Sequence, residues 1–467
     1  MVRRRQRERS LFEVLLPDGH KLWPDWLRRI DTLLEDESVI EVVAQALEQR
    51  WPQSRRRGRP GTPAEIVIRM LILKHLFDWS YDDLEQEVRA NLVYRAFTRI
   101  DADEVPDAKT ILKIAGALGP EVIAQLHRQV IDVAKRAGVT RGRRFRIDTT
   151  VVETNVHYPT DSTLLQDGVR VLTRTMQRAS AAMGDEPARV RNRLRSVTRR
   201  VLTIGYQARS PKTRDALIES YRKLTATTRA VLRDADTMVR RIAQRRHTAA
   251  NGAATVLDRA RVHLQRLRPL VERVVHQTHA RLLGGDTHVP DKVLSLFEPH
   301  TTTIRKGKIS KPNEFGNLVT IQESEQQIIT AYEVHTGRPA DVTLWTSGLD
   351  RHQALFGRAP HLAAGDRGFS SAANEQAATD RGVRRVVLPR RGPKSASRRA
   401  YERQAWFRRG QRWRVGCEGR ISVVKRRHGL RRCRYHGVDG MHRWVGLGVI
   451  ADNLINMATV LGRRAAA

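Results

Sequence analysis

The stretch RRFRIDTTVV, residues 143–152, decides the fold because the spacing of the apolar residues changes there. Before this stretch, apolar residues recur at helical intervals. Within it, Phe145 and Ile147 alternate with Arg146 and Asp148, and two valines follow. Alternation with a period of two is typical of a strand. The pattern therefore predicts that an α/β domain begins here, with Asp148 projecting from its first strand.

Strand and helix patterns alternate through the second half of the chain, which favours an α/β fold with a mixed sheet. Strand patterning returns at Val293, and we expect strands over residues 301–304, 315–321, 327–334, 361–364 and 383–388. Expected helices cover residues 341–355, 371–378 and 445–461, the last of which docks on the sheet. Asp366 follows one of these strands directly and lies between Gly365 and Gly368. Because ligands gather at strand ends in α/β sheets, we expect Asp148 and Asp366 to lie close together.

The stretch QRWRVGCEGRISVVKRRH, residues 411–428, places an acid in a strongly basic region. Residues 390–443 contain eighteen Lys or Arg and three Asp or Glu. If the segment is helical, as its apolar spacing allows, Glu418 and Lys425 share one face about 10 Å apart, and Arg414 lies near the same face. A carboxylate flanked by cations suits a metal ligand beside a phosphodiester. A solvated basic helix with one salt bridge is the alternative, and for an arbitrary Glu it is the commoner case.

Length and charge limit the class of protein. The chain has 467 residues, 40% of them hydrophobic, which suffices for two to four domains and a sizeable core. Its formal net charge of +35 requires a polyanionic partner, for which nucleic acid is the natural candidate. A membrane surface is the rival, but we expect no apolar run of the ~20 residues that a membrane-spanning helix needs and no signal sequence. We therefore expect a cytoplasmic protein.

The remaining segments are mainly helical in pattern. Residues 1–60 carry basic clusters around an amphipathic middle and predict a basic N-terminal arm. Residues 61–140 predict short helices, which fit a helix-turn-helix DNA-binding unit and a plain helical bundle equally well. Residues 164–288 have Arg, Ala and Leu at helical spacing and predict a long helical insertion. The α/β domain then consists of residues 141–163 and 289–462.

Three acids in these surroundings indicate metal-dependent chemistry. Carboxylates are hard oxygen donors that suit Mg²⁺ or Mn²⁺, and the two cysteines, Cys417 and Cys433, provide neither a zinc cluster nor a disulfide framework. Two ions held by Asp148, Asp366 and Glu418 could activate an attacking oxygen and stabilise the leaving oxygen of a phosphodiester. Taken singly, each acid is more often a helix cap, a turn residue or a salt-bridge partner.

Three motifs resemble those of the DDE transposases of bacterial insertion sequences. They are RIDTTVVETNVHYPTDS, AAGDRGF and WRVGCEGRISVVKRRHG, in this order, within a likeness that runs over residues 61–461. The phrases NVHYPTD, KGK and EFG look like the not-yet-classified insertion-sequence group in particular. On this resemblance the two catalytic aspartates fall on Asp148 and Asp366 and the glutamate on Glu418. A signature of Tyr, Arg, Glu and Lys matches Arg414, Glu418 and Lys425, whereas Gln411 stands at the tyrosine position.

The resemblance implies a ribonuclease-H-like catalytic domain and a reaction at the ends of a mobile element. Strand cleavage leaves a 3′-hydroxyl, which then attacks target DNA by transesterification with two Mg²⁺ ions, or Mn²⁺, as cofactors. The implied partners are double-stranded DNA, as terminal inverted repeats and target, and further copies of this chain in a homodimer or larger assembly. The protein would be cytoplasmic and associated with the nucleoid when bound. We expect DNA contacts from the following residues: Arg367, Arg414, Lys425, Arg426, Arg427 and His428.

Other histidines and two other functions stay open at this stage. His157, His300 and His428 are secondary candidates, and each is more often a structural or phosphate-contacting residue than a proton carrier. The chain could be a catalytically silent DNA-binding protein, such as a domesticated transposase. It could also be a ribonuclease-H-like nuclease that cuts but cannot join.

Overall fold

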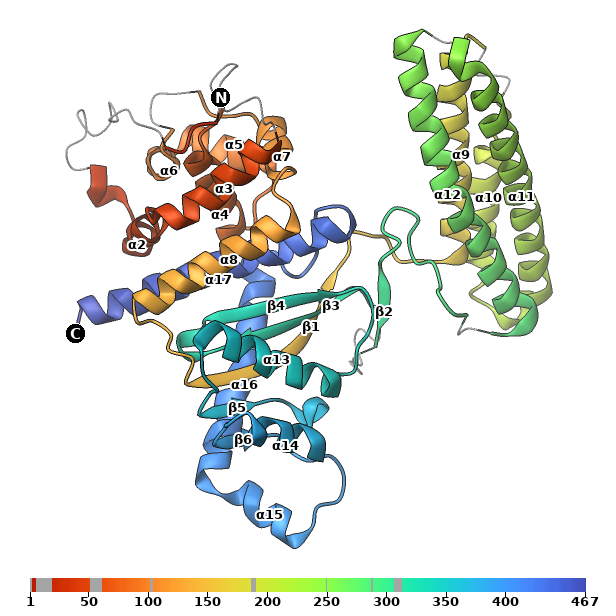
Figure 1. Cartoon of the computed structure of the whole chain (residues 1–467). Coiled ribbons are helices and arrows are strands. Elements are labelled where there is room, and N and C mark those ends of the chain that lie inside the picture. Colours follow the sequence, from red (N-terminus) through yellow and green to blue (C-terminus); the bar gives the residue numbers. More distant parts are fainter. Residues whose placement is uncertain are drawn as a thin grey trace. The chain divides into compact units, whose positions relative to one another are not determined.

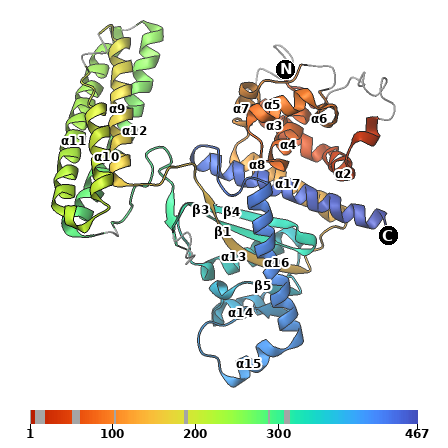
Figure 2. The same cartoon turned by 180° about the vertical axis from the view of Figure 1, so that it is seen from behind.

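The computed structural model describes residues 2–5, 19–50, 61–100, 104–185, 190–248, 250–286, 289–305 and 313–467. The chain divides into two compact units (Figures 1 and 2). The first unit consists of Met1–Asn155 and Ile304–Ala467, and the second of Val156–Thr303. Both candidate motifs at residues 143–152 and 411–428 therefore lie in the first unit.

A mixed sheet forms the centre of the first unit. Its strand order is β2-β3-β1-β5-β6, and β4 also pairs with β3. Strand β3 is antiparallel to β1 and β4, whereas β5 is parallel to both β1 and β6. The strands expected between residues 301 and 388 are confirmed with shifts of up to two residues. Their bounds are β1 (Arg144–Glu153), β2 (Thr302–Ile304), β3 (Glu314–Glu323), β4 (Ile329–His335), β5 (Leu362–Ala364) and β6 (Arg385–Val387).

Helices cover both faces of β1, which is buried at every position after Arg144. Phe145 and Ile147 face α13, where Gly348 leaves room for them. Arg146, on the opposite face, contacts α16 at Gly416. Successive side chains of a strand alternate between faces, so Asp148 shares the α16 face with Arg146. The helices of this α/β part are α13 (Asp341–Phe356), α14 (Ala372–Asp380), α15 (Ala396–Arg403), α16 (Ala405–Arg427) and α17 (Gly437–Ala465), with a 3-10 turn η7 (Arg367–Phe369).

The N-terminal region is helical and packs on α17. One core joins α4, which is buried along its whole length, to its neighbours and to the apolar side chains of α17 from Leu447 to Val460. Helices α2 and α3, in the segment expected to form an arm, also pack in this core. Because α4 is enclosed on all sides, it is a core helix and cannot lie in a DNA groove. The elements are η1 (Gly19–Leu22), α2 (Asp25–Leu34), α3 (Glu37–Arg50), α4 (Ala64–Leu76), α5 (Tyr81–Ala90), α6 (Leu92–Thr98), α7 (Ala108–Ala115) and α8 (Pro120–Arg136).

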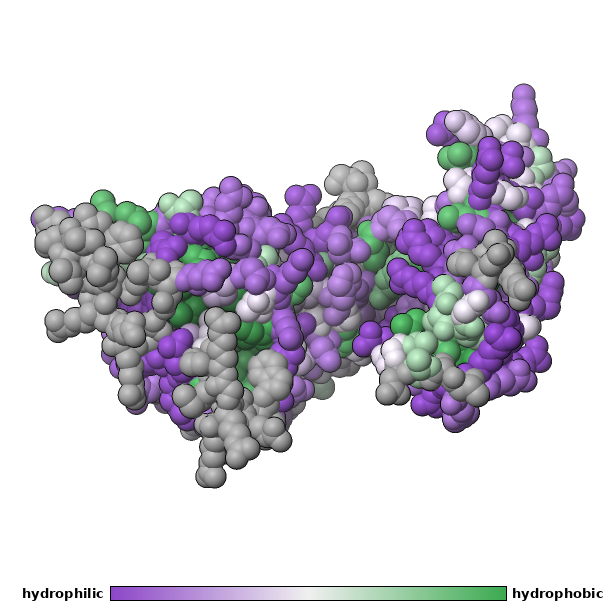
Figure 3. Space-filling model, turned by 90° about the horizontal axis from the view of Figure 1, so that it is seen from above, coloured by the Kyte–Doolittle hydropathy of each residue, from purple (hydrophilic) through white to green (hydrophobic). Residues whose placement is uncertain are grey.

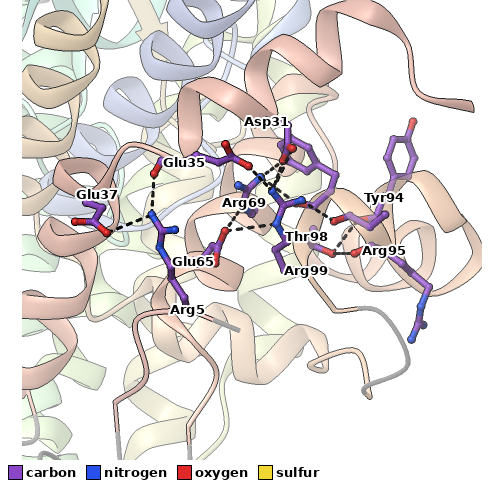
Figure 4. A network of polar contacts seen from close by, with 12 residues as sticks. Arg5, Asp31, Glu35, Glu37, Glu65, Arg69, Tyr94, Arg95, Thr98 and Arg99 are labelled. Carbon is purple, nitrogen blue, oxygen red and sulfur yellow. Dashed lines mark hydrogen bonds and ion pairs between the residues drawn. The ribbon is translucent and has the colours of Figure 1, made fainter. Parts of the chain in front are cut away.

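A buried ion network ties these N-terminal helices together (Figure 4). Arg69 of α4 is fully buried and pairs with Asp31 of α2 and, at 3.1 Å, with Glu65. Arg99, which follows α6, lies 3.0 Å from the same Asp31 and 3.6 Å from Glu65. Arg99 also pairs with Glu35 at 3.2 Å, so three acids offset the charges of two arginines, whose burial would otherwise be costly.

The second unit is a bundle of four long helices around its own apolar core. Its helices occupy the interval between β1 and β2 where we expect the insertion, and the core includes residues from all four. On the face seen in Figure 3, hydrophilic side chains cover most of the described surface, as the high net charge requires. The helices are α9 (Asp161–Ala182), α10 (Leu194–Gln207), α11 (Arg214–Arg245) and α12 (Asn251–Gly284), with 3-10 turns η4 (Pro211–Thr213) and η5 (Arg246–Thr248).

Two expectations from the sequence are wrong. Val293 is not in a strand: it is buried in the core of the four-helix bundle, and its backbone N–H donates to Gln277. Burial of a loop therefore accounts for its apolar pattern. Also, α17 is long and apolar enough to span a membrane by length and composition, although we expect no such run; 72% of its apolar window is buried. It is apolar on several sides because it contributes to both the N-terminal core and the core beneath the sheet.

His127 provides a test of this packing. The ring Nε2 of His127, on α8, lies 2.9 Å from the carbonyl oxygen of Ile329 at the start of β4, and burial lowers its pKa to about 4. In the unfolded chain the His127 ring takes up a proton near pH 6.5. The stabilisation that comes from keeping this ring neutral is therefore complete above that pH and is lost as the pH falls towards 4. Between pH 7 and pH 5 the loss is about 2 kcal/mol. Urea unfolding should show a smaller loss for His127→Gln, and equal losses in both proteins would contradict the account.

Candidate catalytic site

Asp148 lies on β1, and Asp366 follows the end of the neighbouring strand β5 by two residues. The parallel register pairs Arg146 of β1 with Ala364 of β5, so two residues further on Asp148 is level with Asp366. Neighbouring strands are about 4.8 Å apart. Asp366 caps η7, and its Oδ1 accepts a hydrogen bond of 2.6 Å from the backbone N–H of Gly368. The expected proximity of the two aspartates thus has a direct basis in the strand pairing.

Arg414 joins the third acid to this pair. Its guanidinium donates to Oδ2 of Asp148 at 3.0 Å and to Oε1 of Glu418 at 2.8 Å. Burial alone lowers the pKa of Arg414, but the charges of Asp148, Asp366 and Glu418 raise it above its ordinary value. Three acids that are distant in sequence therefore act on one guanidinium. Arg414 is largely buried, with 15% of its side chain exposed, whereas Glu418 is 61% exposed.

The acids supply the donor chemistry of a divalent metal site without forming one in this arrangement. Their carboxylate oxygens suit Mg²⁺ or Mn²⁺. However, within the described residues no group of three His, Cys, Asp or Glu side chains is placed to hold a metal ion. The guanidinium of Arg414 is bonded to two of the three carboxylates. A metal ion held by all three would therefore require Arg414 to give up these bonds.

A buried ion pair fixes α16 over β1. Arg146 pairs with Glu323, its direct partner across the β1–β3 ladder, and both side chains are almost fully buried. Arg146 also donates to the backbone carbonyl of Trp413, and its guanidinium carbon is 4.9 Å from the Trp413 ring centroid. Since Trp413 precedes Arg414, this pair determines where Arg414 meets Asp148. Burial raises the pKa of Glu323, although Arg146 opposes the shift.

Asp341 is a fourth acid at the site that sequence reasoning missed. It is the first residue of α13, and its Oδ1 accepts a hydrogen bond of 3.0 Å from the hydroxyl of Thr149, next to Asp148. A Cβ at Gly368 would collide with Oδ2 of Asp341 and would lie 2.8 Å from Oδ1 of Asp366. Gly368 is thus required because the space between these two carboxylates is too small for a side chain. An acid in the first turn of a helix is common because it stabilises the helix N-terminus. The sequence around Asp341 therefore did not indicate a place at the site.

A pocket lined by arginines lies next to these acids. It has a volume of about 580 Å³, and Thr149, Asp341 and Gly368 form part of its wall. Arginines from four separate segments also line it. They are Arg305, Arg338, Arg367 and Arg391. Their charge makes the pocket a suitable place for a phosphate group near Asp341.

The other residues expected at the site lie in three different environments. Arg426 and Arg427, at the end of α16, are exposed, and Lys425 is half-buried. His428 is buried: its Nδ1 lies 3.0 Å from the carbonyl oxygen of His75, and burial lowers its pKa to about 4. This environment gives His428 a packing role and removes it from contact with DNA. Cys417 is buried as well, beside Glu323.

The ion pair beneath α16 gives a prediction on stability. Glu323→Leu leaves Arg146 buried without its partner and should lower the free energy of unfolding by about 3 kcal/mol. Adding Arg146→Met removes the unpaired charge and should recover part of that loss. Denaturant unfolding of the two single variants and the double variant measures the coupling. Strictly additive losses would show that the two side chains do not stabilise each other.

Comparisons with known proteins agree with the motifs. A transposase domain matches residues 12–115, and a transposase DDE domain matches residues 375–458. The second match contains Arg414, Glu418 and Lys425, while Asp148 and Asp366 lie outside it. An uncharacterized protein, ORF8 of the nfe locus in Rhizobium meliloti, is 27% identical over 123 residues, which cover 25% of this chain and 59% of that protein. No solved structure matches the chain.

The matched domains lie at opposite ends of the chain and have consistent descriptions. The N-terminal match falls on the helical region, and the C-terminal match includes α16 with Glu418. DDE transposases generally use divalent metal ions and act on DNA. Together with the three motifs, these matches support an insertion-sequence DDE transposase.

Proposed function

We propose that this protein cleaves the ends of an insertion sequence and joins the resulting 3′-hydroxyls to target DNA. The observation that carries the proposal is the convergence of Asp148, Asp366 and Glu418 on Arg414, from a strand, a strand exit and a helix. Three acids around one guanidinium, beside an arginine-lined pocket, favour a site for phosphodiester chemistry.

The sheet supports a ribonuclease-H-like catalytic domain. Its central path β4-β3-β1-β5-β6 has antiparallel pairs on one side of β1 and parallel pairs on the other. We propose that this sheet, with α13, α14, α16 and α17, is the ribonuclease-H-like domain and that the four-helix bundle is an insertion after its first strand. The helical region before β1 is the part that we propose to bind element DNA.

The joining step needs no energy source other than the DNA. The oxygen of the 3′-hydroxyl forms a bond to a target phosphorus as the bond from that phosphorus to the next 3′ oxygen breaks, so one phosphodiester replaces another. Two Mg²⁺ ions, the cofactor that we propose, would activate the attacking oxygen and stabilise the leaving oxygen. Asp148, Asp366 and Glu418 would hold them. Arg414 and Lys425 would bind the phosphates beside the reacting bond, with Arg367, Arg426 and Arg427 further along the DNA.

Pairing two element ends requires more than one active site. We therefore propose that the protein acts as a homodimer or a larger assembly on double-stranded DNA, with its terminal inverted repeats and target as substrates. Bacterial DNA is cytoplasmic, so a cytoplasmic, nucleoid-associated location follows from this function. A nuclease that cuts without joining is the second candidate, because the same acids would serve it. A strand-transfer assay with a pre-cleaved 3′-hydroxyl end separates the two, since only a transposase forms the joined product.

Substitution of the acids tests the chemistry. Asp148→Asn, Asp366→Asn and Glu418→Gln should each lower strand cleavage by at least roughly a thousandfold, because each removes a carboxylate from the reacting site. Binding to a duplex that contains one element end should stay within a few-fold. Asp439→Asn, at an exposed position on α17, is the matched control and should cleave normally. Cleavage that survives in Asp148→Asn would exclude this assignment of the catalytic acids.

A further inference from the structure

A second arginine pocket lies at the other end of the parallel strands. It has a volume of about 640 Å³ and lies at the amino ends of β1, β5 and β6. Asp366, by contrast, follows the carboxyl end of β5. Because the three strands are parallel, the residues that precede them meet at one edge of the sheet. Arg143 and Arg144, Arg358 and His361, and Arg384 and Arg385 line the pocket in these three places.

The positive charge of this pocket is not neutralised by acidic side chains in its lining. No acid lines it, and within the described part of the chain none of its five arginines forms an ion pair. All five are exposed. Glu325 does approach this segment, but its carboxylate accepts hydrogen bonds from the backbone N–H of Arg143 and the hydroxyls of Thr140 and Ser324. Five guanidinium groups repel one another unless an anion lies between them.

Two of the arginines are held in place by aromatic rings. The guanidinium carbon of Arg144 is 5.8 Å from the ring centroid of Trp413, and that of Arg385 is 5.7 Å from the ring centroid of Trp406. Both rings belong to α16, the helix that carries Arg414. Stacking of this kind orders a guanidinium and leaves its N–H donors available. The pocket is therefore partly organised for an anion before any ligand binds.

We propose that this pocket binds a backbone phosphate of the DNA duplex on which the acids act. Guanidinium groups recognise phosphate oxygens through paired N–H donors, and a polar pocket of this kind does not suit an apolar ligand. Arg144 precedes Asp148 by four residues on the same face of β1, which is roughly 13 Å along the strand. That separation equals the rise of about four base pairs. The inference rests on the proposed function only in taking DNA as the polyanion.

The test is the salt dependence of DNA binding by the full chain, measured by fluorescence anisotropy in EDTA. The pocket variant is Arg143→Gln with Arg384→Gln. Its matched control is Arg351→Gln with Arg381→Gln, which removes the same charge from arginines already paired with Glu333 and Asp350. The slope of log affinity against log salt should fall by roughly 1 to 2 in the pocket variant and by less than about 0.5 in the control. Equal changes in the two proteins would overturn the proposal.

Two further experiments are needed. One separates an effect of charge on DNA binding from an effect on folding, and the other separates binding of DNA from binding of small anions. Arg143→Lys with Arg384→Lys keeps the charge and should keep most of the slope, whereas a loss as large as that of the Gln variant would assign these arginines to folding. Calorimetry with inorganic phosphate tests whether the pocket binds a small anion and not DNA. Phosphate binding that the pocket variant loses while its DNA slope is unchanged would also overturn the proposal. EDTA stops cleavage, so a smaller slope supports the pocket even if the proposed strand transfer fails.

Discussion

The buried pair of Arg146 and Glu323 is the constraint on which the candidate site depends. It joins β1 to β3, and the bond from Arg146 to the Trp413 carbonyl holds α16 across the same strands. An ion pair in a buried position stabilises only when its geometry is well satisfied, so it specifies one arrangement more than it adds net stability. Here the arrangement that it specifies brings Arg414 to Asp148. The candidate site is therefore positioned by a buried ion pair.

Arg414 gives the site a different character from an open metal centre. It bonds to Asp148 and Glu418, and its position relieves the repulsion among three carboxylates in the DNA-free protein. The same guanidinium would suit a phosphate of DNA, the partner that we propose. Exchange of its carboxylate partners for a phosphate would couple DNA binding to exposure of the acids. Asp341, bonded to Thr149 beside Asp148, holds the opposite side of the site in place.

Sequence patterns predicted the strands and helices, and they failed where contacts between distant parts of the chain determine a residue's environment. Period-two alternation found the strands, and the parallel pairing of β1 with β5 supports the expected proximity of Asp148 and Asp366. Helical spacing put Arg414 and Glu418 on one face but could not tell that Arg414 points inward to the acids. Asp341 and Glu323 were missed because their partners are far away in sequence and come near only through the sheet. His428 was misjudged because an arginine run suggests an exposed helix end, whereas this residue is covered by the N-terminal helices.

The proposed function requires that Asp148, Asp366 and Glu418 hold a divalent cation once Arg414 releases them. Titration of Mn²⁺ into the DNA-free protein, followed by electron paramagnetic resonance of the free ion, tests it most directly. Arg414→Gln should bind Mn²⁺ roughly tenfold more tightly than the natural protein, equivalent to about 1.4 kcal/mol, because its guanidinium no longer bonds to Asp148 and Glu418. Adding Asp148→Asn should abolish that gain. Equal Mn²⁺ affinity with and without Arg414, or a gain that survives loss of Asp148, would contradict the account.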